Sequence, residues 1–150
     1  YWQDKAASQK ALRSGWLHTG DLGYLDADGD LWVVQRRTDL ILSGGENVYP
    51  AEVETVLRQH PSVVEACVVG IPDLEWGQRV AAAVVIHATQ PVTPSELVEF
   101  ARPRLAGYKL PRQVRIVDAL PLTASGKVAR QTVIDWLSQD LPLDGVGDAD

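Results

Sequence analysis

The sequence predicts an α+β fold in which a short hairpin precedes a mixed sheet with helices packed on it. Apolar, β-branched runs at 63–69 and 80–86 are typical of buried strands. Helical apolar spacing recurs at 50–60, 94–105 and 128–137. Strands and helices in this order suit one sheet covered by helices.

The composition excludes several classes of protein. The chain has 150 residues, of which 45% are apolar, so it is long enough for one domain with a core. Its net charge of −6 argues against a nucleic-acid or acidic-membrane binder, and no apolar run reaches the roughly 20 residues of a membrane span. Cys67 is the single cysteine, which fits a reducing compartment. We expect a cytoplasmic protein and, because methionine is absent even at position 1, part of a longer reading frame.

The N-terminal residues predict an arm followed by a hairpin. Residues 1–14 are polar and suit a helix or arm, and the β-prone runs 22–25 and 31–34 flank an Asp/Gly-rich turn at 26–30. These acids resemble part of a calcium loop, but Gly29 is fourth in the run where that loop needs its glycine sixth. We therefore predict a plain turn, no metal site, and a first segment at 1–36.

The central residues predict a helix that begins after two glycines. Pro50 suits the first position of a helix because the amide that it lacks would be unbonded there, and Pro61 ends the helix. The two central strands follow, and residues 72–77 between them are expected to form a loop.

The later residues predict a capped helix, a strand and a last helix. Thr93 and Glu96 flank Pro94 in the pattern of a capping box, and an apolar stripe continues to Leu105. A short strand is expected at 114–117. These elements place a C-terminal domain at 37–138, and the acidic tail at 139–150 is expected to be disordered.

One lysine stands out as a candidate for chemistry. Lys127 follows Gly126 in a loop rich in Ser, Thr and Gly, where an ammonium group could lie beside a phosphate or a developing oxyanion. A phosphate-binding loop for a nucleoside triphosphate is not indicated, because its first glycine is absent and Val128 follows the lysine. The three histidines are far apart in sequence, so a zinc site is not expected.

Five segments in order resemble the C-terminal part of the adenylate-forming acyl-CoA synthetase superfamily. They are GWLHTGDLGY at 15–24, RRTDLILSGGENVYP at 36–50, GIPDLEWG at 70–77, YKLPR at 108–112 and PLTASGKVAR at 121–130. The resemblance implies a small C-terminal lid domain and a two-step reaction. A carboxylate first attacks ATP to give an acyl-adenylate, and coenzyme A then displaces AMP.

The resemblance also implies residues for the first step. Asp21 would hold the ribose hydroxyls of the nucleotide, Arg36 would contact the same ribose, and Lys127 would approach the carboxylate and the α-phosphate. The phosphate loop and the acyl pocket of the family belong to a large N-terminal domain. That domain would also hold the Mg²⁺ that accompanies ATP, for the most part. No segment here matches either feature, so the chain alone is expected to be inactive, with its own N-terminal domain and a small carboxylic acid as partners.

For the second step, the resemblance implies rotation of the small domain about a hinge at Thr38. Ser43, Gly44 and Gly45 would then line the tunnel for the pantetheine arm, where a missing side chain lets a thiol pass close to backbone.

Three further positions resemble residues near the coenzyme A nucleotide, namely Trp76, Tyr108 and Arg112. Stacking on an aromatic ring and a cation opposite phosphates suit that role. Packing in the core is the alternative for Trp76.

The segment 36–50 looks most like the o-succinylbenzoate-CoA ligases of menaquinone biosynthesis, which carry a small hydroxyl residue at the hinge. Medium-chain fatty acyl- and aryl-CoA ligases have nearly the same signature. A carrier-protein thiol as acceptor and a non-catalytic binding module stay open as alternatives.

Overall fold

The computed structural model describes residues 2–36 and 39–139, which divide into two compact units, Tyr1–Asp39 and Leu40–Asp150. We call them unit 1 and unit 2. The predicted boundary after residue 36 stays a prediction, although the observed division lies nearby. The hinge predicted at Thr38 lies outside the described residues, as do residues 140–150 of the tail expected at 139–150. The expectation is wrong for Gln139, which is the last residue of a helix.

Unit 1 contains the predicted hairpin. Its strands β3 and β4 are antiparallel, as predicted, and the Asp26 carboxylate caps the turn by accepting bonds from the Asp30 amide and the Trp32 indole. The indole hydrogen bond is the main reason why the pKa of Asp26 lies below its ordinary value. The elements of unit 1 are α1 Lys5–Ala11, β1 Leu12–Arg13, β2 Trp16–Leu17, β3 Asp21–Leu25 and β4 Leu31–Arg36.

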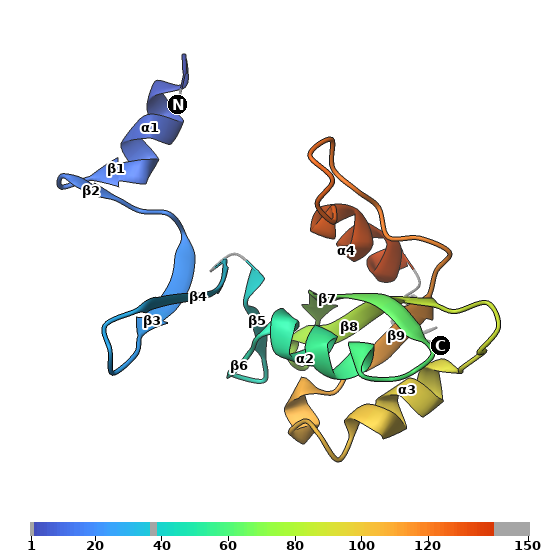
Figure 1. The fold of residues 1–150 in the computed structure, drawn as a ribbon. Helices are drawn as coiled ribbons and strands as arrows, with labels where there is room; N and C mark the ends of the chain where they lie inside the picture. The colour runs from blue at the N-terminus through green and yellow to red at the C-terminus, as the bar shows by residue number, and fades with distance from the viewer. Residues whose placement is uncertain (1, 37–38, 140–150) are drawn as a thin grey trace, which may run out of the picture. The chain divides into compact units, whose positions relative to one another are not determined.

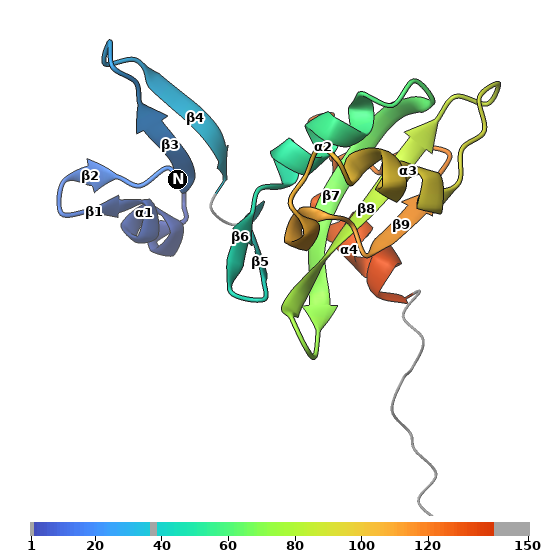
Figure 2. The same cartoon turned by 90° about the horizontal axis from the view of Figure 1, so that it is seen from below.

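Unit 2 is built on a mixed five-stranded sheet (Figure 1). Four strands lie in the order β6-β5-β8-β7 and pair antiparallel, whereas β9 pairs parallel to β8 (Figure 2). The predicted fold class is therefore confirmed. The strands are β5 Ile41–Ser43, β6 Glu46–Val48, β7 Val63–Asp73, β8 Gly77–Ile86 and β9 Gln113–Ile116.

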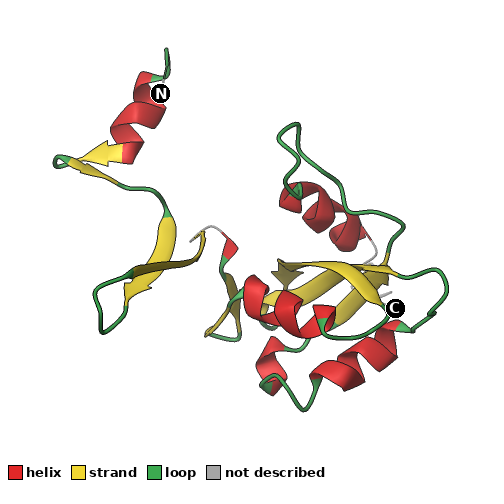
Figure 3. Cartoon of the chain, in the orientation of Figure 1, coloured by secondary structure: helices red, strands yellow, loops and turns green. Residues whose placement is uncertain are grey.

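Helices cover both faces of this sheet (Figures 1 and 3). Because successive strand residues point to opposite faces, Val68 packs with Leu57 and Leu97 on one face, and Cys67 packs with Val133 and Leu137 on the other. Full burial of each leucine contributes about 1.5–3 kcal/mol. The helices are α2 Pro50–Arg58 and α3 Pro94–Ala101 on the first face, α4 Arg130–Gln139 on the second, and the 3₁₀ helix η2 Gly107–Lys109.

The loop predicted at 72–77 is wrong, because strand pairing continues into it. Pro72 pairs with Gln78, and Asp73 pairs with Gly77, so the connection between β7 and β8 is a tight turn. Proline is tolerated in β7 because this strand lies at the edge of the sheet, where one missing N–H costs no partner.

The predicted helix at 94–105 is confirmed at its start and wrong at its end. Both bonds of the capping box between Thr93 and Glu96 are present, but α3 ends at Ala101. Pro103 has no N–H to continue the helical ladder, and Leu105 is nevertheless buried against the same core.

Candidate functional site

In unit 1, Asp21 and Arg36 lie opposite each other on the two strands of the hairpin. Arg36 Nε lies 3.8 Å from Asp21 Oδ1, and the side chain of Arg36 is 71% exposed. A loose, exposed ion pair contributes little to stability. The Asp21 carboxylate therefore keeps the capacity to accept bonds from a pair of hydroxyl groups, and the contact of Asp21 and Arg36 with a ribose stays a prediction.

In unit 2, Gly44 and Gly45 form the turn between β5 and β6, and Ser43 is the last residue of β5. This small hairpin was not predicted, because three-residue strands carry too short an alternation to be recognised. Gly44 has a φ of +59° and Gly45 a φ of +84°, so both occupy the left-handed region that favours glycine. Ser43 is buried, and the turn leads through β6 to Pro50, the first residue of α2, as predicted.

The Gly44 turn packs directly against Trp76. The Gly44 amide donates to the Trp76 carbonyl oxygen over 2.9 Å, and a methyl group added at Gly44 would lie 2.6 Å from Trp76 Cε3. The Arg112 guanidinium lies over the indole ring, 4.1 Å from its centroid. That face of the ring is thus covered, so this geometry favours the packing alternative for Trp76 over stacking of a nucleotide base there.

Trp76 also carries an unused donor. Its Nε1 atom is buried and has no hydrogen-bond partner within residues 2–36 and 39–139. Buried indole N–H groups are normally bonded, so this atom is a candidate donor to a ligand or to another part of the protein.

Asp73 holds the turn that carries Trp76, a role that the sequence analysis missed. Its Oδ1 accepts from the amides of Trp76 and Glu75 over 2.9 and 3.0 Å, and Oδ2 lies 3.9 Å from Arg79 Nε. The bond from the Trp76 amide is the main reason why the pKa of Asp73 lies below its ordinary value, and Arg79 and Arg112 lower it further. An aspartate two or three residues before a turn amide is the signal that could have revealed it.

Tyr108 and Arg112 make different contacts, although the sequence analysis grouped them. Tyr108 lies in η2, is half-buried against the core, and has the Lys109 ammonium 5.7 Å from its ring centroid. Arg112 is joined to β8 by a bond from its amide to the Val80 carbonyl oxygen. The structure therefore brings Arg112, but not Tyr108, onto Trp76.

Lys127 lies on a tight, exposed hairpin before α4. Its amide donates to Thr123 Oγ1, its carbonyl oxygen accepts from the Thr123 amide over 2.7 Å, and Gly126 supplies the turn with a φ of +79°. Leu122 and Val128 pair across the base. The lysine side chain is exposed, and the described part of the chain gives its ammonium no partner, so a hydrogen-bonded hairpin presents a free cation.

Two features bear on metals and membranes. The described residues contain no cluster of three or more His, Cys, Asp or Glu side chains that could hold a metal ion. None of the described helices has the length and apolar character that crossing a bilayer requires.

Comparison with known proteins identifies the family. Residues 52–127 match the AMP-binding enzyme C-terminal domain, so the chain belongs to that family, as its motifs predicted. It is 51% identical to a 2-succinylbenzoate–CoA ligase of Bacillus mycoides (strain KBAB4) over 131 residues, which are 87% of this chain and 27% of the relative. The chain thus spans about a quarter of the length of the curated relatives that it matches.

Solved structures agree with this assignment. The o-succinylbenzoate coenzyme A synthetase of Bacillus subtilis, bound to its acyl-adenylate intermediate, superposes with a TM-score of 0.81 at 48% identity, covering 89% of this chain and 27% of that one. The ATP-bound MatB of Rhodopseudomonas palustris gives a TM-score of 0.85 at 32% identity, over 92% of this chain and 28% of that one.

Proposed function

We propose that this chain is the C-terminal part of an ATP-dependent carboxylate–coenzyme A ligase that acts on o-succinylbenzoate. The observation that carries the proposal is the 51% identity, over 87% of the chain, to a relative named as a 2-succinylbenzoate–CoA ligase. The chain spans 27% of that relative, so activity requires a partner N-terminal domain that supplies the acyl pocket and the phosphate loop. The proposed use of ATP and coenzyme A, together with a single free cysteine, supports a cytoplasmic location for this enzyme.

Three residues would act when the carboxylate is adenylated. Asp21 would accept bonds from the ribose hydroxyls, with Arg36 beside it. Lys127 would bring a compact cation to the oxygens on which negative charge builds. The described residues offer no cluster suited to Mg²⁺, so that ion would be held by the partner domain.

Other residues would act when the thioester forms. In this proposal the small domain turns about Thr38, and Ser43 with the turn of Gly44 and Gly45 comes to line the path of the pantetheine arm. The exposed Gly45, where an added methyl group would meet nothing within 4 Å, supports this use. Trp76 Nε1, Arg112 and Tyr108 remain the groups proposed to lie near the coenzyme A nucleotide.

The proposal is tested by ATP–pyrophosphate exchange with the full-length ligase across a panel of acids that includes o-succinylbenzoate, medium-chain fatty acids and aryl acids. The 150-residue chain is assayed in parallel. We expect exchange by the full-length protein with o-succinylbenzoate and none by the chain alone. Exchange with another acid only would replace the substrate, and exchange by the chain alone would contradict the need for a partner domain.

The role of Lys127 is tested in the same protein. Lys127→Ala should lower adenylation by about a hundredfold or more, because a cation aimed at developing charge is lost. Thioester formation from supplied acyl-adenylate and coenzyme A should change little. Lys10→Ala, at an exposed lysine of α1, is the control. Equal losses in both steps would contradict the proposal that Lys127 acts in adenylation only.

A further inference from the structure

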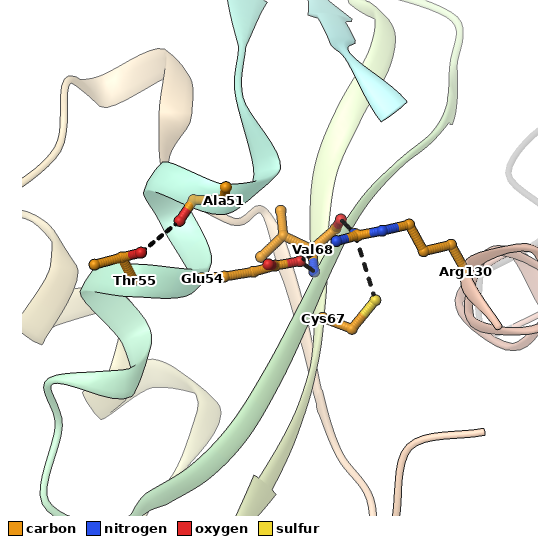
Figure 4. Close-up of polar contacts among 6 residues, drawn as sticks. All are labelled: Ala51, Glu54, Thr55, Cys67, Val68 and Arg130. Atoms are coloured by element: carbon orange, nitrogen blue, oxygen red, sulfur yellow. Dashed lines mark hydrogen bonds and ion pairs between the residues drawn. The ribbon is translucent and has the colours of Figure 1, made fainter. Parts of the chain in front are cut away.

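A side-chain bridge joins α2, β7 and α4 (Figure 4). Arg130 Nη2 donates to Glu54 Oε1 over 2.9 Å, and Arg130 Nη1 donates to the Val68 carbonyl oxygen over 2.7 Å. The same Glu54 oxygen accepts from the Val68 amide over 2.9 Å. One residue of β7 is thereby bonded to two helices that lie on opposite faces of the sheet.

The Glu54 end of this bridge is buried, so the charge of Glu54 needs a partner. The Glu54 side chain is 8% exposed and that of Arg130 is 32% exposed. A buried carboxylate is costly without a partner, and removal of one member of such a pair leaves the other uncompensated. The two side chains therefore fix where α4 begins relative to the sheet.

Arg130 is the first residue of α4 and follows Lys127 by three positions. The Lys127 hairpin closes immediately before it, through the bond from the Ala129 amide to the Pro121 carbonyl oxygen. The Lys127 ammonium has no side-chain anchor of its own within the described residues. Its location thus depends on the backbone, and the backbone is tied to the sheet at Arg130.

We propose that the bridge of Arg130 and Glu54 is a positioning device for Lys127. This inference rests on the proposed function, since it assigns the pair a part in adenylation only. Loss of the bridge would let the hairpin shift, and a displacement of about 1 Å at a reacting centre can cost on the order of a hundredfold in rate. The thioester step, which does not use Lys127, would be spared.

The test uses the full-length ligase and measures single-turnover formation of acyl-adenylate, so that slow variants remain measurable. Arg130→Gln should lower the adenylation rate between about tenfold and a hundredfold, with little change in KM for ATP. Thioester formation from supplied acyl-adenylate should be nearly unchanged. Arg102→Gln is the matched control, because it removes an arginine from an exposed pair with Glu99 on α3.

A double variant separates positioning from general destabilisation. If Arg130 acts through Lys127, adding Arg130→Gln to Lys127→Ala should change the remaining rate by less than about twofold. Multiplicative losses, equal losses in both steps, or no loss on Arg130→Gln would each overturn the inference. If Arg130→Gln does not fold, Arg130→Lys and Glu54→Gln replace it in the same comparison. A normal adenylation rate in Lys127→Ala alone would instead overturn the role proposed for Lys127, and an unaltered ligase that adenylates no acid would overturn the proposed function.

Discussion

Gly44 and Gly45 are adjacent residues that both have a left-handed backbone conformation, but their surroundings differ. An added methyl group would lie 2.6 Å from the Trp76 ring at Gly44 and would meet nothing within 4 Å at Gly45. A left-handed conformation costs an ordinary residue about 1–2 kcal/mol. We therefore expect Gly45→Ala to lower the free energy of unfolding by about that amount and Gly44→Ala to lower it by more. Chemical denaturation of both variants measures this, and equal losses would contradict the packing of Gly44 on Trp76.

The Asp73 carboxylate makes stability depend on pH. Its pKa is lowered in the folded protein, mainly by the Trp76 amide, so its contribution is present above the unfolded value of 3.8 and is lost as pH falls through the folded value. Asp73→Asn should therefore weaken the protein at pH 7 and flatten the fall in stability below about pH 4. Denaturation at a series of pH values measures both effects. Asp118→Asn, which removes an exposed carboxylate elsewhere, is the matched control.

The sequence predicted single residues where the signal is local and missed them where it is distant. Lys127 follows a glycine in a polar turn, and the hairpin that brings Asp21 opposite Arg36 was predicted from its two β-prone runs, although the pairing itself was not. The bridge between Glu54 and Arg130 joins residues 76 apart in sequence. No local pattern encodes such a contact, because it exists only once α2 and α4 have packed on the sheet.

Among the elements, α3 begins at a capping box formed by Thr93 and Glu96. Thr93 Oγ1 accepts from the Glu96 amide, and the Glu96 carboxylate accepts from the Thr93 amide. Thr93→Ala should reduce the free energy of unfolding by about 0.5–2 kcal/mol, the usual cost of removing a cap. Ser95→Ala is the control, because it removes a hydroxyl group two residues after Thr93 without removing a cap. Losses of equal size in the two variants would show that the capping box does not stabilise α3.

Element ends were predicted well where a residue's covalent structure sets them. Pro50 begins α2 as expected, since its backbone suits only the start of a helix. The end of α3 was missed although Pro103 marks it locally, whereas the lengths of β7 and β8 were missed because they depend on pairing with distant residues. Pro72 reads as a strand breaker until the sheet places β7 at its edge.

At the scale of the molecule, both core clusters draw every member from residues 41–137. None of the described side chains of unit 1 is buried. A protein comprising residues 40–139 should therefore fold by itself, with a Tm within a few degrees of that of the 150-residue chain. Calorimetry of both proteins measures this. A large loss of Tm in the shorter one would show that unit 1 stabilises the sheet.

Exposed apolar side chains in unit 1 fit the short span of the chain relative to its relatives. Trp16, Leu25, Leu31 and Trp32 are each more than half exposed. Leu25 and Leu31 are paired across the hairpin, and neighbouring exposed apolar groups are typical of surfaces that contact other protein. The fold class of unit 2 could be predicted from the sequence because all of its core residues lie within the unit. What surrounds the exposed apolar residues of unit 1 could not be predicted from the sequence.

The bridge on β7 has a consequence for how the molecule meets copies of itself. β7 runs from Val63 to Asp73 at the margin of the sheet, and such a margin is a template on which another chain can add a strand and begin to aggregate. Val68 is the central residue of this run, and both of its main-chain groups are already occupied by Glu54 and Arg130. An incoming strand would have to displace a buried ion pair halfway along its path. The contacts that hold the Lys127 hairpin therefore also protect the sheet against self-association.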